Sequence, residues 1–390
     1  MIDEGLIEFA SPRQAEFVRT VNEIGSVRGA ARELGIHHKT VQKSLDRLKL
    51  SAANRGYSPA HKWTHTVPEG FGIKRMSTNF DREGNVAQQW VISNPDQQQQ
   101  LKMMQAAIEA MCGEIKPLAP TIPPVLGNEN LLNLYTITDY HMGLACSKLE
   151  GLPADWDLNI AEDTLVSLFE NLISRSPNAH TAVLNQLGDF LHFDSLLAVT
   201  PTSHHVLDAA SRYELLVQVV IRAMRRVVSM LLQEYQHVHI IMAEGNHDLA
   251  SSVWLRQMFA VLYENEPRVT VDTSHVPFYC YEWGKTFLGF HHGHRKKKES
   301  LPLLFAAMFR ESFGRTTAGW IHTGHEHHVD EKEYPGFKVI QHPTIAAPDN
   351  YAVSHGWMSQ REASVITYHK NGYQVSRTTM TPEMLDAAVC

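Results

Sequence analysis

Five short apolar segments of this sequence each precede residues of metal-binding types. The clearest is 238–243, which is followed by Gly245, Asn246, His247 and Asp248. The other four span 134–138, 181–187, 286–290 and 320–323, and they precede Asp139-Tyr140-His141, Gly188-Asp189, His292-Gly293-His294 and Gly324-His325-Glu326-His327. Parallel strands end at one edge of a sheet, where α/β proteins place their chemistry. The pattern therefore predicts five strands whose polar ends share one site.

Helical segments alternate with these strands, and the alternation predicts a layered α/β domain. We expect helices over 160–174, 207–235, 253–263 and 301–313. Further strands are expected over 338–341, 363–369 and 373–378.

The first 55 residues predict three short helices. Ser11 and Pro12 begin a helix that ends at Gly25, and two more follow over 27–34 and 37–49 with a glycine turn between them. This is the outline of a helix-turn-helix. The polar residues of the third helix that are expected to face a DNA groove are Lys39, Thr40, Gln42, Lys43 and Arg47. A three-helix bundle used for protein contacts is the alternative.

A β-hairpin is predicted where the runs 71–79 and 86–93 flank polar turn residues, and a helix follows over 96–114. The prolines between 117 and 124 mark a domain boundary. We therefore expect a helix-turn-helix domain over 1–55, a hairpin-and-helix module over 56–116, a Pro-rich linker over 117–127 and a catalytic domain over 128–390.

Composition narrows the possible partners. The formal net charge of -7 excludes a uniformly basic nucleic-acid coat, so any DNA contact needs a local patch. Four singly placed cysteines give neither a zinc ribbon nor a disulfide scaffold and favour a reducing cytoplasm. No apolar run reaches the roughly 18 residues that span a bilayer, so no membrane partner is expected.

The strand-end residues supply three oxygen ligands and four imidazoles: Asp139, His141, Asp189, Asn246, His292, His325 and His327. Such a set without thiolates suits borderline divalent ions. Seven ligands hold two ions if one carboxylate bridges them, and two ions together clamp a phosphate. His247, beside Asn246, is then placed to protonate the leaving oxygen.

The motifs Asp-x-His, Gly-Asp, Gly-Asn-His-Asp, His and Gly-His-x-His occur in this order, and in this the sequence resembles the calcineurin-like metallophosphoesterase superfamily. The resemblance covers about the last two-thirds of the chain. It implies a four-layered β-sandwich flanked by helices, and His247 as transition-state stabiliser or general acid. It implies one metal on Asp139, His141, Asp189 and His327, and a second on Asp189, Asn246, His292 and His325.

Within the superfamily, Gly188-Asp189-Phe190-Leu191-His192 resembles the Gly-Asp-Leu-Phe-His of SbcD-type double-strand-break repair nucleases, which implies an exonuclease role for His192. The arginine-bearing motif of the protein serine/threonine phosphatases is missing. Only about 60 residues follow His327, which argues against the nuclease capping domain and a Rad50-like ATPase partner. The combination of a helix-turn-helix with this catalytic domain is similar to phage-encoded metallophosphoesterases.

The run Arg295, Lys296, Lys297 and Lys298 adds positive charge beside the expected metal edge, either as a solvated loop or as a contact for substrate phosphates.

The sequence thus predicts a cytoplasmic two-metal phosphodiesterase, most simply a DNA nuclease, in the host cytoplasm if phage-encoded. Manganese is the expected metal, with iron, zinc, nickel and magnesium open, as is homo-oligomer formation. The alternatives are a small-nucleotide phosphodiesterase or phosphatase whose helical module serves assembly, and a DNA-binding regulator with a structural metal domain.

Overall fold

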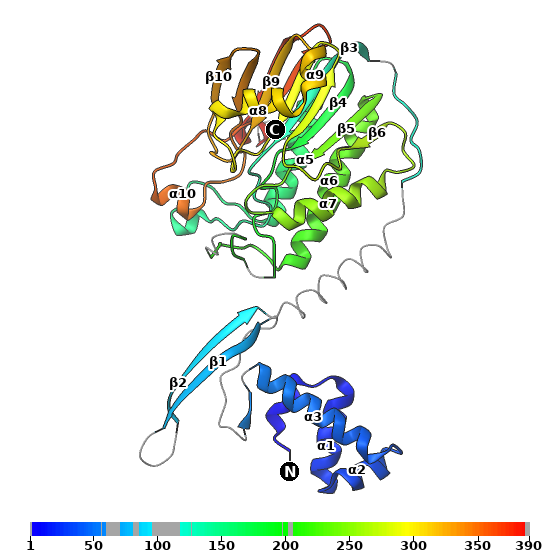
Figure 1. The fold of residues 1–390 in the computed structure, drawn as a ribbon, viewed down its shortest axis with the longest axis vertical. Coiled ribbons are helices and arrows are strands. Elements are labelled where there is room, and N and C mark those ends of the chain that lie inside the picture. The colour runs from blue at the N-terminus through cyan, green and yellow to red at the C-terminus, as the bar shows by residue number, and fades with distance from the viewer. Residues whose placement is uncertain are drawn as a thin grey trace. The chain divides into compact units, whose positions relative to one another are not determined.

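A computed structural model describes residues 2–55, 57–59, 71–80, 86–95, 118–125, 127–196, 198–201 and 206–386. The chain splits into two compact units, residues 1–114 and 115–390 (Figure 1). The helix expected over 96–114 lies outside the described residues.

The first unit begins with four short helices: η1 (Glu4–Phe9), α1 (Pro12–Ile24), α2 (Val27–Glu33) and α3 (His38–Asn54). Ser11 caps α1, because its hydroxyl accepts a hydrogen bond from the Gln14 amide while the Gln14 side chain accepts from the Ser11 amide. The helices share an apolar core of Phe17, Val18, Val21, Ala30, Ala31, Val41, Leu45, Leu48 and Ala52. Burial of Ala52 in this core explains why α3 continues beyond the predicted end at residue 49.

The predicted hairpin is present in the same unit. Strands β1 (Phe71–Phe80) and β2 (Val86–Pro95) pair antiparallel, with Ser77 opposite Trp90.

The second unit contains a six-stranded sheet in the order β13-β12-β3-β4-β5-β6. Its strands are β3 (Asn128–Ile137), β4 (Ala179–Gln186), β5 (His237–Met242), β6 (Val269–Val271), β12 (Ala363–His369) and β13 (Tyr373–Met380). Strands β3 to β6 run parallel, while β12 pairs antiparallel with both β3 and β13. The parallel strands therefore end at one edge.

A five-stranded sheet in the order β10-β11-β9-β8-β7 forms the other half of this unit. Its strands are β7 (Tyr279–Trp283), β8 (Thr286–Phe290), β9 (Ala318–Thr323), β10 (Asp330–Tyr334) and β11 (Phe337–Gln341). The three central strands run parallel, and the two outer strands pair antiparallel with them.

The two sheets pack face to face between two layers of helices (Figure 1). The core between the sheets includes Leu134, Val183 and Ile241 from one and Leu288 and Phe290 from the other. Helices α5 (Leu158–Arg175), α6 (Tyr213–Glu234) and α7 (Leu249–Leu262) cover the outer face of the six-stranded sheet. Helices α8 (Leu301–Met308) and α9 (Arg310–Arg315) cover the five-stranded sheet. The predicted fold class, a four-layered α/β sandwich preceded by helices and a hairpin, is confirmed.

The predicted helices that depart most from the structure are those expected over 207–235 and 301–313. The helix expected over 207–235 begins only at Tyr213, because the segment before it pairs with the loop after β3: the Ala210 amide donates to Gly143 O at 2.8 Å. The helix expected over 301–313 divides at Phe309, whose φ of -111° and ψ of 49° interrupt it. No helix within the described ranges is long and apolar enough to cross a membrane.

The segment 118–125, which the sequence predicts as part of a linker, belongs to the second unit and is hydrogen-bonded to other residues of it. The Leu118 amide donates to Leu262 O at 2.8 Å, and the Thr121 amide donates to Glu266 Oε2 at 2.7 Å. The Arg268 guanidinium also bonds the Thr121 hydroxyl. These contacts tie the start of the segment to the loop between α7 and β6.

Candidate metal centre and nucleic-acid interface

The loops after five strands meet at one edge of the second unit. There the side chains form three clusters of ligand atoms, each with all atoms within 4.8 Å of one another. The clusters are Asp139, His141 and His327; Asp139, Asp189, His292 and His325; and His141, His192 and His247. The structure thus brings together the six carboxylate and imidazole residues expected to bind metal, with both histidines expected to act in catalysis. Asp139 belongs to two clusters, whereas the sequence assigned the bridging role to Asp189.

The backbone at this edge is in an unusual conformation. Among the described residues, only five other than glycine have a positive φ, and these are Asp139 (50°), His141 (47°), Asp189 (51°), His325 (75°) and His327 (55°). Left-handed backbone is costly for side chains other than glycine and is kept where the surroundings impose it. All five are expected ligands, so the strain is concentrated where the side chains converge.

Two motif glycines make room for the carboxylates. A Cβ atom at Gly245 would lie 1.9 Å from Asp189 Oδ1, and one at Gly324 would lie 2.7 Å from Asp139 Oδ2. No side chain fits at such distances. The glycine before Asn246 and the glycine before His325 are therefore required for the backbone to approach the two aspartates.

Asp139 is buried and held by hydrogen bonds to one oxygen. Its Oδ2 accepts from the Thr138 hydroxyl at 2.6 Å and from the His325 amide at 2.8 Å. Burial alone would raise the pKa of this carboxyl, but His327 and His292 lower it below its ordinary value. The group is therefore an anion at neutral pH, with Oδ1 directed at histidine: His327 Nε2 lies 3.1 Å away.

The His292 ring is held in one orientation by a hydrogen bond from the ring nitrogen that faces away from the carboxylates. Its Nδ1 donates to Leu187 O at 2.8 Å, which leaves Nε2 facing Asp189 Oδ2 at 3.2 Å and Asp139 Oδ1 at 3.8 Å. Histidine ligands in metal sites are commonly fixed by such a bond from the other ring nitrogen. The structure therefore supports His292, among the three neighbouring histidines of that loop, as the residue that faces the carboxylates.

The donor set fits divalent ions. Asp139 Oδ1, Asn246 Oδ1 and His292 Nε2 are all buried and have no hydrogen-bond partner among the described residues. Buried polar atoms are rarely left without a partner in folded proteins. All three are the atoms expected to bind metal, and carboxylate, amide and imidazole groups suit the borderline divalent ions.

His192 and His247 lie beside this centre. His192 Nδ1 is 3.2 Å from His141 Nδ1, and His247 Nδ1 donates to His192 O at 2.7 Å. Burial and the neighbouring His247 lower the pKa of His192 to about 3, so its ring is neutral at pH 7. His247 is also tied to the centre by its amide, which donates to Asp189 Oδ1 at 2.8 Å.

Two residues that hold the site together, Asp248 and Thr344, had no role assigned from the sequence. The buried carboxylate of Asp248 accepts from the amides of Phe190 (2.8 Å) and Gly245 (2.9 Å), and thereby joins the loops after β4 and β5. The Thr344 hydroxyl donates to Asp139 O at 2.6 Å. The last residue of Gly-Asn-His-Asp gave a signal for Asp248, whereas nothing in the local sequence marks Thr344.

The basic run beside the metal edge is partly neutralised. Arg295 pairs with Glu244 at 2.6 Å, and Lys298 pairs with Asp330 at 2.5 Å and with Glu326 at 3.6 Å. Lys296 and Lys297 are exposed. The expected cluster of four charges is thus divided into two paired and two exposed cations.

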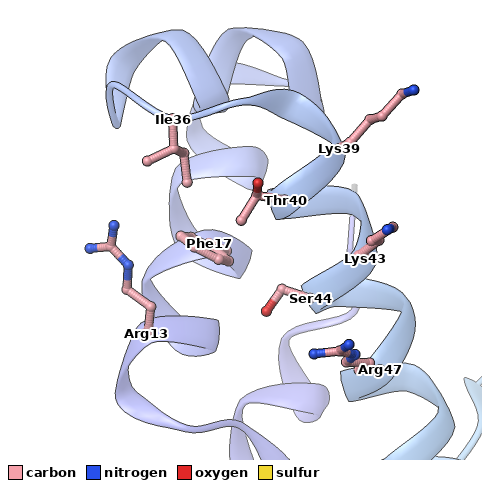
Figure 2. Close-up of a pocket in the computed structure, with 8 residues that line it drawn as sticks. All are labelled: Arg13, Phe17, Ile36, Lys39, Thr40, Lys43, Ser44 and Arg47. Carbon is pink, nitrogen blue, oxygen red and sulfur yellow. The ribbon is translucent and has the colours of Figure 1, made fainter.

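The residues expected to contact DNA in the first unit are all exposed on α3: Lys39, Thr40, Gln42, Lys43 and Arg47. Figure 2 shows Lys39, Lys43 and Arg47 in succession along this helix, with Arg13 projecting from α1. Between them lies a groove of about 460 Å³ whose floor includes Phe17, Thr40 and Ser44. Gln42 also bonds Asp46 within α3 at 2.9 Å.

No family model and no curated protein matches the sequence. Among the solved structures that match is a Streptococcus pneumoniae protein described as a predicted phosphoesterase, with 9% sequence identity and a TM-score of 0.28. The match covers 65% of this chain and 99% of that chain. Another is Vps29 of Entamoeba histolytica in complex with zinc, with 12% sequence identity and a TM-score of 0.27. That match covers 64% of this chain and 98% of the Vps29 chain. A third is the 5′-nucleotidase of Candida albicans, with 13% sequence identity and a TM-score of 0.27. That match covers 68% of this chain and 54% of the nucleotidase chain. Likeness at this level says nothing about substrate or activity.

Proposed function

We propose that this chain is a two-metal phosphodiesterase of the calcineurin-like type that hydrolyses nucleic acid, with DNA as its substrate and manganese as its metal. One observation carries the proposal: two clusters of carboxylate and imidazole ligand atoms, each within 4.8 Å, share Asp139. Two divalent ions held there would polarise a phosphate and activate a water molecule for attack. The SbcD-type branch, a phage origin and a cytoplasmic location belong to the same proposal.

The residues of the metal edge would have three roles: binding the ions, fixing the loops and transferring a proton. Asp139, Asp189 and the surrounding imidazoles would hold the ions, and Asp248 fixes the loops that carry Asp189 and Asn246. His247 donates from Nδ1 to the His192 carbonyl, so its Nε2 is the atom that transfers a proton to the leaving oxygen. His192 supports this arrangement through its contact with His141.

Recruitment to DNA is assigned to the first unit. The exposed cations of α3 and the neighbouring Arg13 border one groove, which supports contact with a phosphate backbone (Figure 2). The helix-turn-helix assignment rests on the short helices α2 and α3 and the Gly35 turn between them.

A second candidate function is a phosphodiesterase for a small nucleotide, and one observation favours it. Arg295 and Lys298 are occupied by acidic partners, so the metal edge offers less free positive charge to a long polyanion than the sequence suggested. In that case the helical unit serves assembly.

The test uses the purified full chain with manganese. We expect metal-dependent cleavage both of bis(p-nitrophenyl) phosphate and of end-labelled DNA, and loss of both activities in Asp189→Asn. Cleavage of the small ester without cleavage of DNA would move the small-nucleotide function ahead. Failure on every phosphodiester with metal bound would contradict the proposal.

A further inference from the structure

A cluster of exposed aromatic side chains lies in the loop between β11 and β12. Tyr351 belongs to the short helix α10 (Asn350–Ser354), and His355 and Trp357 follow it. The exposed fractions of the Tyr351 and Trp357 side chains are 60% and 57%, and the next residue, Met358, is 63% exposed. Large aromatic side chains exposed together on a protein surface commonly mark a binding site.

The three rings are organised by contact with one another. The His355 ring lies 4.3 Å from Tyr351 and 5.0 Å from Trp357 between ring centroids, and the Tyr351 and Trp357 rings meet edge to face at 5.6 Å. The backbone fixes this arrangement, because Asp349 caps α10 through the Ala352 amide and the Trp357 amide donates to Ala352 O at 2.9 Å. The rings are thus held in place while much of their surface faces solvent.

The loop that carries the rings starts at the metal centre. Thr344 bonds the backbone of Asp139, and Tyr351 follows seven residues later. Seven extended residues reach at most about 25 Å, which bounds the distance from that anchor. Figure 1 shows α10 beside the teal segment that contains η3 (Lys148–Glu150), and the contact of Cys146 Sγ with Pro348 O at 3.6 Å agrees with this. The aromatic cluster therefore lies on the side of the unit where the ligand-bearing loops gather.

We propose that Tyr351, His355 and Trp357 form a stacking platform for the bases of single-stranded nucleic acid whose backbone enters the metal centre. The inference rests on the proposed function, because the platform needs a polynucleotide substrate. The inference narrows the substrate to nucleic acid with unpaired bases, and it assigns the selection of such strands to these three residues.

The chemistry of the cluster fits nucleobases. Every base offers a flat π-face, and stacking on an exposed aromatic ring needs no particular sequence. Tyrosine, histidine and tryptophan also carry polar ring atoms that suit a surface in contact with water. Since the platform lies some distance along the loop from Asp139, it acts on bases a few positions from the cleaved bond and contributes more to long strands than to a dinucleotide.

The experiment compares Tyr351→Ala and Trp357→Ala with wild-type full chain on a single-stranded decanucleotide, on the same strand with abasic sites, and on bis(p-nitrophenyl) phosphate. One base stacked on one ring strengthens binding about 5- to 150-fold. We expect each variant to raise KM for the decanucleotide about tenfold, with unchanged kinetics on the small ester. Trp357→Phe is expected to restore most of the affinity. Binding of the labelled strand is measured in parallel by fluorescence anisotropy.

The matched control is Tyr373→Ala. Tyr373 is 49% exposed and stacks on His369 at the other end of the six-stranded sheet, where β12 pairs with the start of β3. We expect this variant to behave as wild type on all three substrates.

Three results would overturn the inference: no change in decanucleotide binding or KM in either alanine variant, an equal loss on the abasic strand, or a change of oligomeric state without a change in strand affinity. The last would identify the cluster as a protein contact. If wild type cleaves the small ester and the alanine variants have no effect, only this inference fails. If wild type cleaves no phosphodiester, the proposed function fails, and anisotropy still decides whether the rings bind bases.

Discussion

The metal edge of the second unit and the basic face of α3 both consist of residues that the sequence singled out, yet they differ in how firmly the fold holds them. At the metal edge, Asp139 and Asp189 are buried, and backbone amides and neighbouring histidines fix their oxygens. On α3, Lys39, Lys43 and Arg47 are exposed at the surface of a small helical core. A preorganised buried site serves chemistry, whereas flexible exposed cations serve electrostatic attraction.

The largest effect is expected from Asp189→Asn, which removes a buried carboxylate from the cluster of Asp139, Asp189, His292 and His325. We expect DNA cleavage and ester cleavage to fall about 10⁴-fold or more, because both the nucleophile and the charge stabilisation depend on the bound ions. Kinetic assays with metal analysis of the purified variant check this. Asp155→Asn is the control, since that exposed carboxylate accepts a hydrogen bond from the Lys148 amide in a surface loop. Near-normal turnover in Asp189→Asn would remove the metal edge from the reaction.

His247→Ala separates proton transfer from metal binding. We expect the variant to keep its metals and to lose roughly 10²- to 10⁴-fold in DNA cleavage, where the leaving alkoxide needs a proton. The loss on bis(p-nitrophenyl) phosphate should be far smaller, because nitrophenolate leaves without protonation. Equal losses on the two substrates would show that His247 has no acid role.

Charge reversal on α3 tests the other region. Replacing Lys39, Lys43 and Arg47 with glutamate should weaken DNA binding about 100-fold at low salt. It should also flatten the salt dependence by about 0.9 in slope for each DNA phosphate that the protein no longer neutralises. Turnover of the small ester should stay unchanged. Glu substitutions at Arg175, Arg225 and Arg226, three exposed arginines on α5 and α6, are the control for net charge. Unchanged DNA affinity and salt slope would make the helical unit an assembly module.

Acid should destabilise the two units differently. Burial lowers the pKa of His239 and of His342 to about 3, below the value near 6.5 in the unfolded chain. The unfolded state then binds more protons below pH 6.5, so stability falls as pH drops towards 3, by about 1.4 kcal/mol per pH unit for each group. In the helical unit, partial desolvation and the neighbouring His37 also lower the pKa of His38, but that ring is not buried, so solvent screens the effect and the penalty is smaller.

Calorimetry between pH 7 and 5, with hydrogen exchange to assign each transition to its unit, measures this difference. His239→Gln should reduce the pH dependence of the second unit, because it removes one titrating ring. The same pH dependence in both units, or no change in His239→Gln, would contradict the account.

Much of the arrangement at the metal edge could be predicted from the sequence because each expected ligand follows a short apolar strand, so that pattern and position are local. Contacts between distant segments could not. Asp139 depends on Thr344, which is 205 residues away, and Arg295 is paired with Glu244, 51 residues before it. The start of α6 also differs from the predicted start, because the apolar pattern before Tyr213 predicts helix but Ala210 instead pairs with Gly143. Tertiary contacts decide such features, and no short window of sequence contains them.

The most direct measurement of the central claim is anomalous diffraction from crystals of the full chain grown with manganese. The account predicts two peaks about 3.5 to 4 Å apart. One should lie against Asp139, His141 and His327, the other against Asp189, His292 and His325 with Asn246 beside it, and Asp139 or Asp189 should contact both. A single peak, two peaks that share no carboxylate, or peaks away from these residues would contradict it.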